Sequence, residues 1–306
     1  MAKKLSEYEK LIQKAQSTRK SITKQNQIEI RRMYRRVAKA WGEAVERQGT
    51  AMTLSWLTTH APTLDRALED IGSKIEALIE AGILTVADSV IDAELTYWNG
   101  VVLATTTKEA AEALKAVYAE YPQQVVAELV KGSVYKGGAG LSNRIWKYSS
   151  RQKNDLSRII QDGIMNARSA YDIAKDMERY VAPTMRKPWD WSKVYPWSNK
   201  KIDYNAQRLA RTSVTHAYQL SLVKATEKNP YITKYQWHAS NSSRKCEICE
   251  ERDGKLYEKN DLPLDHPNGM CTVSCVIEKD YDAIARELHD WAEGADMPEI
   301  DEWIFG

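Results

Sequence analysis

The sequence predicts a mainly α-helical chain with a small zinc-stapled β module near its C-terminus, an α+β class. Three observations support this prediction. Residues 1–180 contain long stretches with apolar side chains at helical spacing. Short segments rich in β-branched and aromatic residues appear between residues 231 and 277. All four cysteines of the 306-residue chain lie in the same C-terminal part. Because a small sheet has little core, a metal ion would supply much of its folding free energy.

Two long helical regions open the chain. Residues 3–48 contain no proline and show an imperfect apolar stripe, with a shift at residues 21–27 that predicts a break. Pro62 predicts the start of the next helix, because proline is favoured in a first helical turn. We expect Gly82 to interrupt this helix and residues 84–103 to form another.

Shorter elements follow. Threonines at 105–107 can cap a helix over residues 108–121, whose first turn is acidic. A further helix is predicted from residue 205 to about residue 228. Residues 136–140 form a glycine-rich run that lacks the spacing of a phosphate-binding loop and predicts a hinge.

Three segments predict the β module. Residues 231–238 alternate between two faces, and residues 256–257 and 271–277 are β-branched or aromatic. The turn at residues 252–255 is a hairpin signal. Together these segments predict a three-stranded sheet.

The chain is long enough for about two domains. We expect residues 1–145 to form a helical, interaction-making region with candidate DNA contacts. Residues 150–280 form the second region, with the zinc module at residues 231–277, and residues 281–306 form an acidic C-terminal tail.

Charge is unevenly distributed although the formal net charge is only +2. The basic start is either a solvated helix face or a surface for DNA phosphates or an acidic partner. Its arginines include Arg31, Arg32, Arg35 and Arg36. No apolar run approaches the ~20 residues of a membrane helix, and the opening residues lack the apolar core of a signal peptide. We therefore expect no membrane partner.

Residues 183–200 combine three prolines with three tryptophans, Trp189, Trp191 and Trp197. A loop this rich in tryptophan either packs on the protein's own core or docks a neighbour, because tryptophan anchors interfaces.

The cysteines predict a metal site. Cys246 and Cys249 can grip one ion from a tight turn, and His266 and Cys271 can complete a tetrahedron. Cys275 is a fifth candidate, but four residues of strand span about 13 Å, whereas two sulfurs on one zinc lie roughly 4 Å apart. We therefore predict structural Zn²⁺ on the first four residues and keep Cys275 in reserve. Disulfide pairing is the weaker alternative, because bridging cysteines belong mostly to small secreted domains.

We predict no catalytic residue. His216 has no nucleophile or carboxylate partner at helical spacing. A hydrolase or nuclease using Glu250, Glu251 and Asp253 remains an alternative, although a zinc ion with four protein ligands leaves no position for water. A nucleic-acid-binding regulator is a second alternative, favoured only by the basic start.

The segment from Trp237 to Ile277 resembles the C-terminal module of phage head morphogenesis proteins, minor capsid proteins that include the F protein of phage Mu. That family's pattern is a Trp-containing strand, a Cys-x-x-Cys turn, a glycine, His-Pro-x-Cys-Arg-Cys and a strand. The matching positions here are Trp237, Cys246, Cys249, Gly254, His266 and Pro267. Gly269 and Met270 stand where the family has Cys-Arg, and Cys271 matches the last cysteine.

Two further matches lie upstream. Residues 210–213, Ala-Arg-Thr-Ser, resemble the helix that precedes the zinc module, and residues 156–180 resemble a helix pair. The resemblance covers roughly residues 150–280. It implies a minor head protein of a tailed phage or prophage, present in few copies inside the capsid and in the host cytoplasm during assembly. The implied partners are the portal protein and capsid or scaffold proteins, with DNA as a further candidate.

Overall fold

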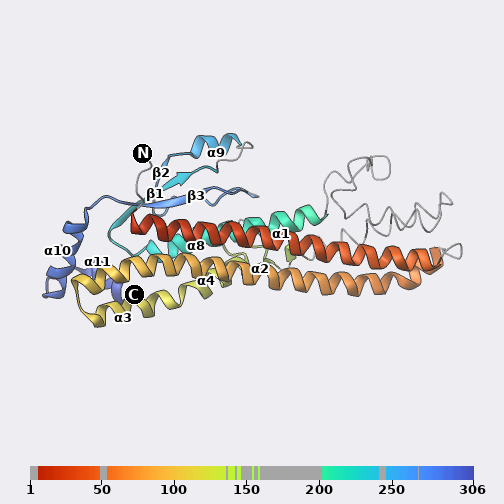
Figure 1. Cartoon of the computed structure of the whole chain (residues 1–306), viewed down its shortest axis with the longest axis horizontal. Helices are drawn as coiled ribbons and strands as arrows, with labels where there is room; N and C mark the ends of the chain where they lie inside the picture. The colour runs from red at the N-terminus through yellow and green to blue at the C-terminus, as the bar shows by residue number, and fades with distance from the viewer. Residues whose placement is uncertain are drawn as a thin grey trace. The chain divides into compact units, whose positions relative to one another are not determined.

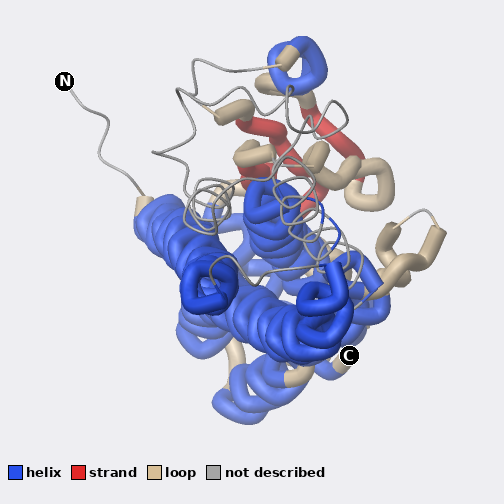
Figure 2. Tube along the Cα trace, turned by 90° about the vertical axis from the view of Figure 1, so that its right-hand side faces the viewer, coloured by secondary structure: helices blue, strands red, loops and turns tan. Residues whose placement is uncertain are grey.

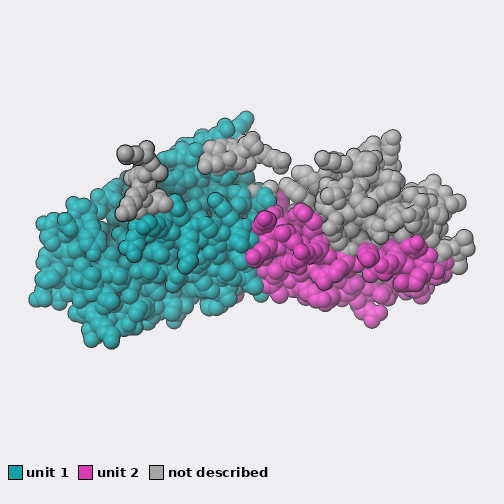
Figure 3. Space-filling model, viewed as in Figure 1, with its two compact units in different colours: residues 1–23, 80–129, 211–306 teal, residues 24–79, 130–210 magenta. Residues whose placement is uncertain are grey.

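The computed structural model describes residues 6–48, 54–135, 137–141, 143–145, 154, 158, 202–240, 246–267 and 269–306. The chain divides into two compact units (Figure 3). Unit 1 comprises residues 1–23, 80–129 and 211–306, and unit 2 comprises residues 24–79 and 130–210. The predicted division of labour between residues 1–145, 150–280 and 281–306 stays a prediction.

Helix α1 is one continuous helix, Glu7–Gln48, so the predicted break at residues 21–27 is wrong (Figure 1). The packed face continues through this stretch with polar residues instead of apolar ones. Thr23 and Asn26 are both buried, and Asn26 Nδ2 donates to the backbone carbonyl of Leu78 at 3.5 Å. The packed face of this helix is therefore longer than the apolar residues alone predict.

Helix α2 is also a single helix, Leu54–Thr105, with Pro62 in its interior. The predicted start at Pro62 and the predicted interruption at Gly82 are both wrong. A glycine inside a helix costs only about 1 kcal/mol relative to alanine. Burial of neighbours such as Ile79 and Ile83 outweighs that cost. Pro62 removes one backbone donor, and the helix continues on both sides of it.

The predicted cap of the next helix is confirmed. Helix α3, Lys108–Ala119, begins after Thr107, whose side chain accepts from the Ala110 N–H at 3.2 Å. Helix α4, Tyr121–Lys131, follows directly. The glycine-rich run after it forms a turn, in which Gly137 and Gly138 adopt φ of 93° and 61°.

Helix α8, Ile202–Thr226, confirms the helix predicted after residue 205. Every residue from 212 to 219 along it is buried. This buried stretch includes polar side chains such as Thr215, His216 and Gln219. A buried helix with polar residues needs hydrogen-bond partners for them, and the C-terminal module supplies several.

The predicted three-stranded sheet is confirmed (Figure 2). Strand β1 is Ile232–His238, β2 is Leu256–Glu258 and β3 is Thr272–Ile277, in the order β2-β1-β3 with both pairs antiparallel. The short helix α9, Glu247–Arg252, lies in the chain between β1 and β2. The turn at residues 252–255 therefore connects α9 to β2, with Gly254 at φ 75°.

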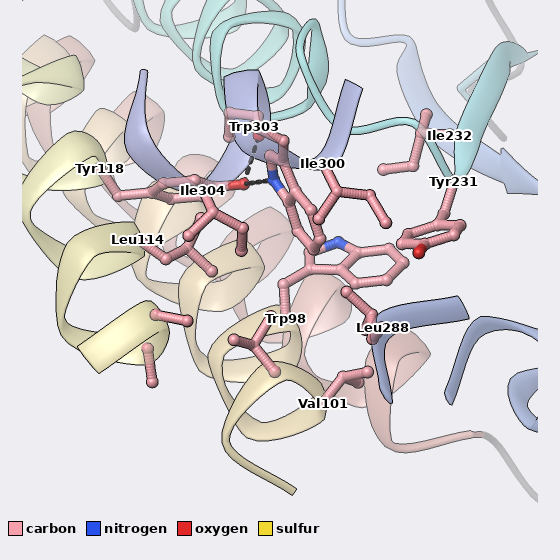
Figure 4. Close-up of a cluster of buried hydrophobic side chains, with 14 of the residues drawn as sticks. Trp98, Val101, Leu114, Tyr118, Tyr231, Ile232, Leu288, Ile300, Trp303 and Ile304 are labelled. Carbon is pink, nitrogen blue, oxygen red and sulfur yellow. Dashed lines mark hydrogen bonds between the residues drawn. The ribbon is translucent and has the colours of Figure 1, made fainter. Parts of the chain in front are cut away.

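The acidic last residues form two helices, α10 (Tyr281–Ala292) and α11 (Pro298–Phe305). Trp303 of α11 is buried in the core of unit 1, and its Nε1 donates to the Tyr118 hydroxyl at 3.4 Å (Figure 4). Its ring meets that of Trp98 edge to face at 5.5 Å. The acidic segment thus contributes to the unit 1 core. No helix in the described part of the chain is long and apolar enough to cross a membrane.

Candidate metal centre

Cys246 and Cys249 lie at the start of α9. Cys246 is the N-cap residue, with extended backbone, and Cys249 is the third helical residue. This first-turn spacing brings the two Sγ atoms to 3.4 Å from each other. Cys249 is buried and Cys246 is half-buried. The two thiols therefore converge where the helix begins.

His266 comes to the same point from a separate loop. Its Nε2 lies 3.3 Å from Cys246 Sγ and 3.0 Å from Cys249 Sγ. Its Nδ1 lies 3.2 Å from the carbonyl oxygen of Pro267. A proton on Nδ1 that donates to this carbonyl leaves Nε2 free to offer its lone pair, as in metal-bound histidines.

Cys271 brings the fourth predicted ligand to the cluster. Its Sγ is 3.3 Å from Cys249 Sγ, and the residue is buried. Cys249 belongs to two trios of ligand atoms lying within 4.8 Å of one another, one with Cys246 and His266 and one with Asp265 and Cys271. All four predicted ligands therefore meet around the Cys249 thiol.

The donor set fits a structural zinc ion. Three thiolates and one imidazole are a common set for structural zinc. A tetrahedron with Zn–S bonds of about 2.3 Å has edges of about 3.8 Å. The sulfur–sulfur distances of 3.3 and 3.4 Å around Cys249 are slightly shorter. Cys271 Sγ does not lie within 4.8 Å of both Cys246 Sγ and His266 Nε2, so binding of one ion by all four residues requires Cys271 to move toward those two ligands.

The pKa values of the Cys249 and Cys246 thiols are shifted in opposite directions. Burial raises the pKa of the Cys249 thiol, and hydrogen bonding to the Cys271 and Cys246 thiols raises it further. The pKa of the Cys246 thiol is lowered, chiefly by the backbone N–H of Cys249. The Cys249 thiol thus resists ionisation more than the Cys246 thiol.

Asp265 organises the loop that bears His266 and Cys271. Its buried carboxylate accepts from the His266 N–H at 2.8 Å through Oδ1 and from the Cys271 N–H at 3.0 Å through Oδ2. Each carboxylate oxygen therefore accepts a hydrogen bond from the backbone of one candidate ligand residue. Gly269 leaves room for this carboxylate, because a Cβ there would lie 2.1 Å from Asp265 Oδ2.

Helix α8 holds the same loop from outside. The Asp265 N–H donates to Gln219 Oε1 at 2.8 Å, and His216 Nε2 lies 2.9 Å from the Asp265 carbonyl oxygen. Thr215 Oγ1 donates to the Gly269 carbonyl at 3.2 Å. His216 therefore has a positioning contact with the loop.

A second helix reaches the loop. Arg19 of α1 donates from Nη1 to the Cys271 carbonyl at 2.9 Å and from Nη2 to the Met270 carbonyl at 3.2 Å. Sequence reasoning missed Arg19, Asp265, Gln219 and Thr215. For the α8 residues, the available signal was a run of polar side chains in a helix ahead of the cysteines.

Cys275, the reserve ligand, lies elsewhere. It pairs with Tyr235 across the sheet and packs against the hydrophobic core of unit 1. Burial raises the pKa of its thiol, and nearby Glu94 raises it further. The four preferred ligands thus lie around the Cys249 thiol, whereas the half-buried reserve residue packs against the core.

The residues predicted to bind DNA or a partner protein differ in their exposure and contacts. Arg32 is exposed and pairs with Glu29, and Arg36 is exposed. Arg31 is half-buried and donates to Gln207 Oε1 at 3.3 Å. Arg35 lies in α1, but its side chain is outside the described structure. Trp189, Trp191 and Trp197 lie outside the described residues, as does the segment 159–180.

The acidic residues of the hydrolase alternative are partly used in local structure. Glu251 pairs with Lys255 at 2.8 Å. Asp253 Oδ1 accepts from the Ala239 N–H at 2.8 Å. Two of the three carboxylates thus support the turn after α9, and the third, Glu250, is exposed.

Fold and site define a mainly helical protein whose small β module holds a cluster of three cysteines and one histidine. Residues 154–278 match the family model described as phage Mu protein F like protein. This match confirms the resemblance to the phage head morphogenesis family. It ends one residue after β3, so it includes α8, the sheet and the metal-site loop. No curated protein and no solved structure matches the chain.

Proposed function

We propose that the chain is a minor head protein of a tailed bacteriophage or prophage and acts in head assembly as a structural component. The main support for this proposal comes from the position of the candidate metal ligands. The four predicted ligands converge within the segment that matches the phage Mu protein F like family.

In this proposal Cys246, Cys249, His266 and Cys271 hold one structural Zn²⁺. The ion joins the first turn of α9 to the loop before β3. A sheet whose strands have only 7, 3 and 6 residues buries too little surface to fix such loops by itself. With four protein ligands the ion has no open position, so its role is structural.

The proposed partners are the portal protein and capsid or scaffold proteins, within the capsid interior. Residues 1–145 make these contacts in the proposal, and residues 150–280 form the metal-stapled region. The exposed lysines of α1 support an anionic partner, for which DNA is a candidate. Those among the first 24 residues are Lys10, Lys14, Lys20 and Lys24.

The test uses a phage or prophage that encodes this chain. Wild type and Cys249→Ser are compared for their presence in purified heads and for head yield. We expect wild-type chain in heads at few copies with one zinc per chain, and reduced incorporation of Cys249→Ser. Absence of the wild-type chain from both heads and assembly intermediates would refute the proposed function. Presence without zinc would refute only the metal assignment.

A further inference from the structure

Arg19 is an unusual residue in this chain. It belongs to α1, is 0% exposed, and lies more than 250 residues before the carbonyls to which it donates. Its guanidinium carbon lies 5.2 Å from the centroid of the Tyr218 ring. Among the described residues no carboxylate lies within 4.0 Å of it. A buried cation without a paired carboxylate requires other compensation.

The compensation comes from the metal-site loop and α8. Burial lowers the pKa of Arg19, whereas Tyr218, Asp265 and Cys271 act in the opposite direction by favouring its charged form. The two carbonyl hydrogen bonds add to this support. If the loop moved away, the guanidinium would stay buried and lose both acceptors, which is costly for a charged donor.

Arg19 also fixes the backbone on the side of Cys271 that Asp265 does not reach. Asp265 Oδ2 accepts from the Cys271 N–H, and Arg19 Nη1 donates to the Cys271 carbonyl. Both polar backbone groups of one ligand residue are therefore held by buried charged side chains. Such contacts orient a metal ligand before the metal arrives.

The net charge of the proposed zinc centre favours a positively charged side chain at position 19. A zinc ion with three thiolates and a neutral imidazole carries a net charge of about −1. The Cys271 thiolate interacts favourably with the Arg19 guanidinium. A permanent positive charge stabilises such a centre, whereas a neutral side chain of similar length would not.

We infer that Arg19 is a positioning residue for the Cys271 ligand, and that metal binding is coupled to docking of residues 7–23 of α1. The inference rests on the proposed metal site. Coupling is reciprocal: if the docked helix strengthens metal binding, the metal must strengthen docking of the helix by the same factor.

The first test measures metal affinity on the full chain. Zinc is titrated in competition with a chromophoric chelator, and Co²⁺ spectra report the ligand geometry. We expect Arg19→Met to weaken zinc binding about 10- to 100-fold, the range for residues that orient metal ligands. Arg19→Lys keeps the charge but not the two-pronged donor, so we expect an intermediate loss. Lys20→Met removes an exposed charge on the next residue and should bind zinc as wild type does.

The second test uses hydrogen exchange, first on the wild type, where the result does not depend on the folding of any variant, and then on Arg19→Met. We expect zinc to slow amide exchange in residues 12–23 of α1 as well as in α9. In Arg19→Met, zinc should still slow exchange in α9 but no longer in α1.

The outcomes separate this inference from the proposed function. If wild type binds one zinc but exchange in α1 does not respond to the metal, the coupling is refuted and the metal site stands. Wild-type affinity in Arg19→Met refutes the positioning role. If wild type binds no zinc, both the metal assignment and this inference fall, whatever the result for incorporation into heads.

Discussion

Replacing Gly269 with alanine should damage the metal site without touching a ligand. A Cβ at this position would lie 2.1, 2.2 and 2.3 Å from the Oδ2, Cγ and Oδ1 atoms of Asp265. All three distances are far below contact distance, so the carboxylate must move. Its side chain has no exposed surface into which it could swing. The displacement therefore breaks the hydrogen bonds to the His266 and Cys271 amides.

The magnitude follows from those two bonds. Hydrogen bonds to a charged group contribute about 1.5–3 kcal/mol each, and partial relaxation of the loop recovers part of the loss. We expect the zinc-bound protein to lose about 3 kcal/mol of unfolding free energy. If the loss falls on the metal-bound state alone, zinc affinity drops about 100-fold, since 1.4 kcal/mol corresponds to a factor of ten.

Urea unfolding with saturating zinc and a zinc competition titration measure the two quantities. Gly100→Ala is the matched control, because a Cβ there meets no atom within 4 Å and the position is inside α2. Alanine is favoured over glycine in helices by about 1 kcal/mol, so this control should be equal to wild type or more stable. A Gly269→Ala protein within 0.5 kcal/mol of wild type and with unchanged zinc affinity would refute the role assigned to Asp265.

Four further outcomes are expected. Cys249→Ala should lose zinc in metal analysis by mass spectrometry while Cys275→Ala retains it; the reverse result would move the site to Cys275. Burial raises the pKa of Glu94 to about 7, so the folded state binds a proton that the unfolded state releases above its ordinary pKa near 4.5. Stability should therefore fall by about 3 kcal/mol as the pH rises through that window and level off above 7. Urea unfolding at pH 5 and 8 should show this fall in wild type relative to Glu94→Gln; equal pH slopes in the two proteins contradict it. Limited proteolysis should cut first at the exposed, left-handed Gly137–Gly138 turn and leave a C-terminal fragment that contains zinc; a first cut elsewhere argues against a hinge there. DNA binding should weaken steeply with salt, and replacing Lys14 and Lys24 with glutamine should lower the slope of log K against log salt by about one per lysine; an unchanged slope removes α1 as the DNA surface.

The residues of the candidate site could be proposed from the sequence because the spacing of cysteines and histidines along the chain indicates metal binding. Cys246 and Cys249 are three residues apart, and His266 and Cys271 are five apart. Strand geometry separated Cys271 from Cys275, and in the structure Cys275 is half-buried and packs against the core. The residues that hold the ligands could not be found in this way. Arg19 contacts a residue 252 positions away, and no local pattern reports a contact of that range.

The fold could be predicted to a similar extent and for similar reasons. The cap at Thr107 and the three strands depend on near neighbours, and both were predicted. The lengths of α1 and α2 depend on what packs along them. Buried Thr23 and Asn26 look like breaks in an apolar stripe, and Gly82 resembles a helix end. Only tertiary packing shows that these residues lie on packed faces.

The position of Cys271 explains why so many hydrogen bonds hold the loop that bears His266 and Cys271. It directly precedes β3, whose Val273 is fully buried opposite Trp237. A displacement of the ligand would therefore strain the first residues of this strand, and a register slip of one residue would turn every side chain of β3 to the other face. Cys275 would then lose its contact with the core. The charged contacts from Asp265 and Arg19 hold the metal ligand and the strand register together, so a loss of metal should be felt in the sheet and in α1 alike.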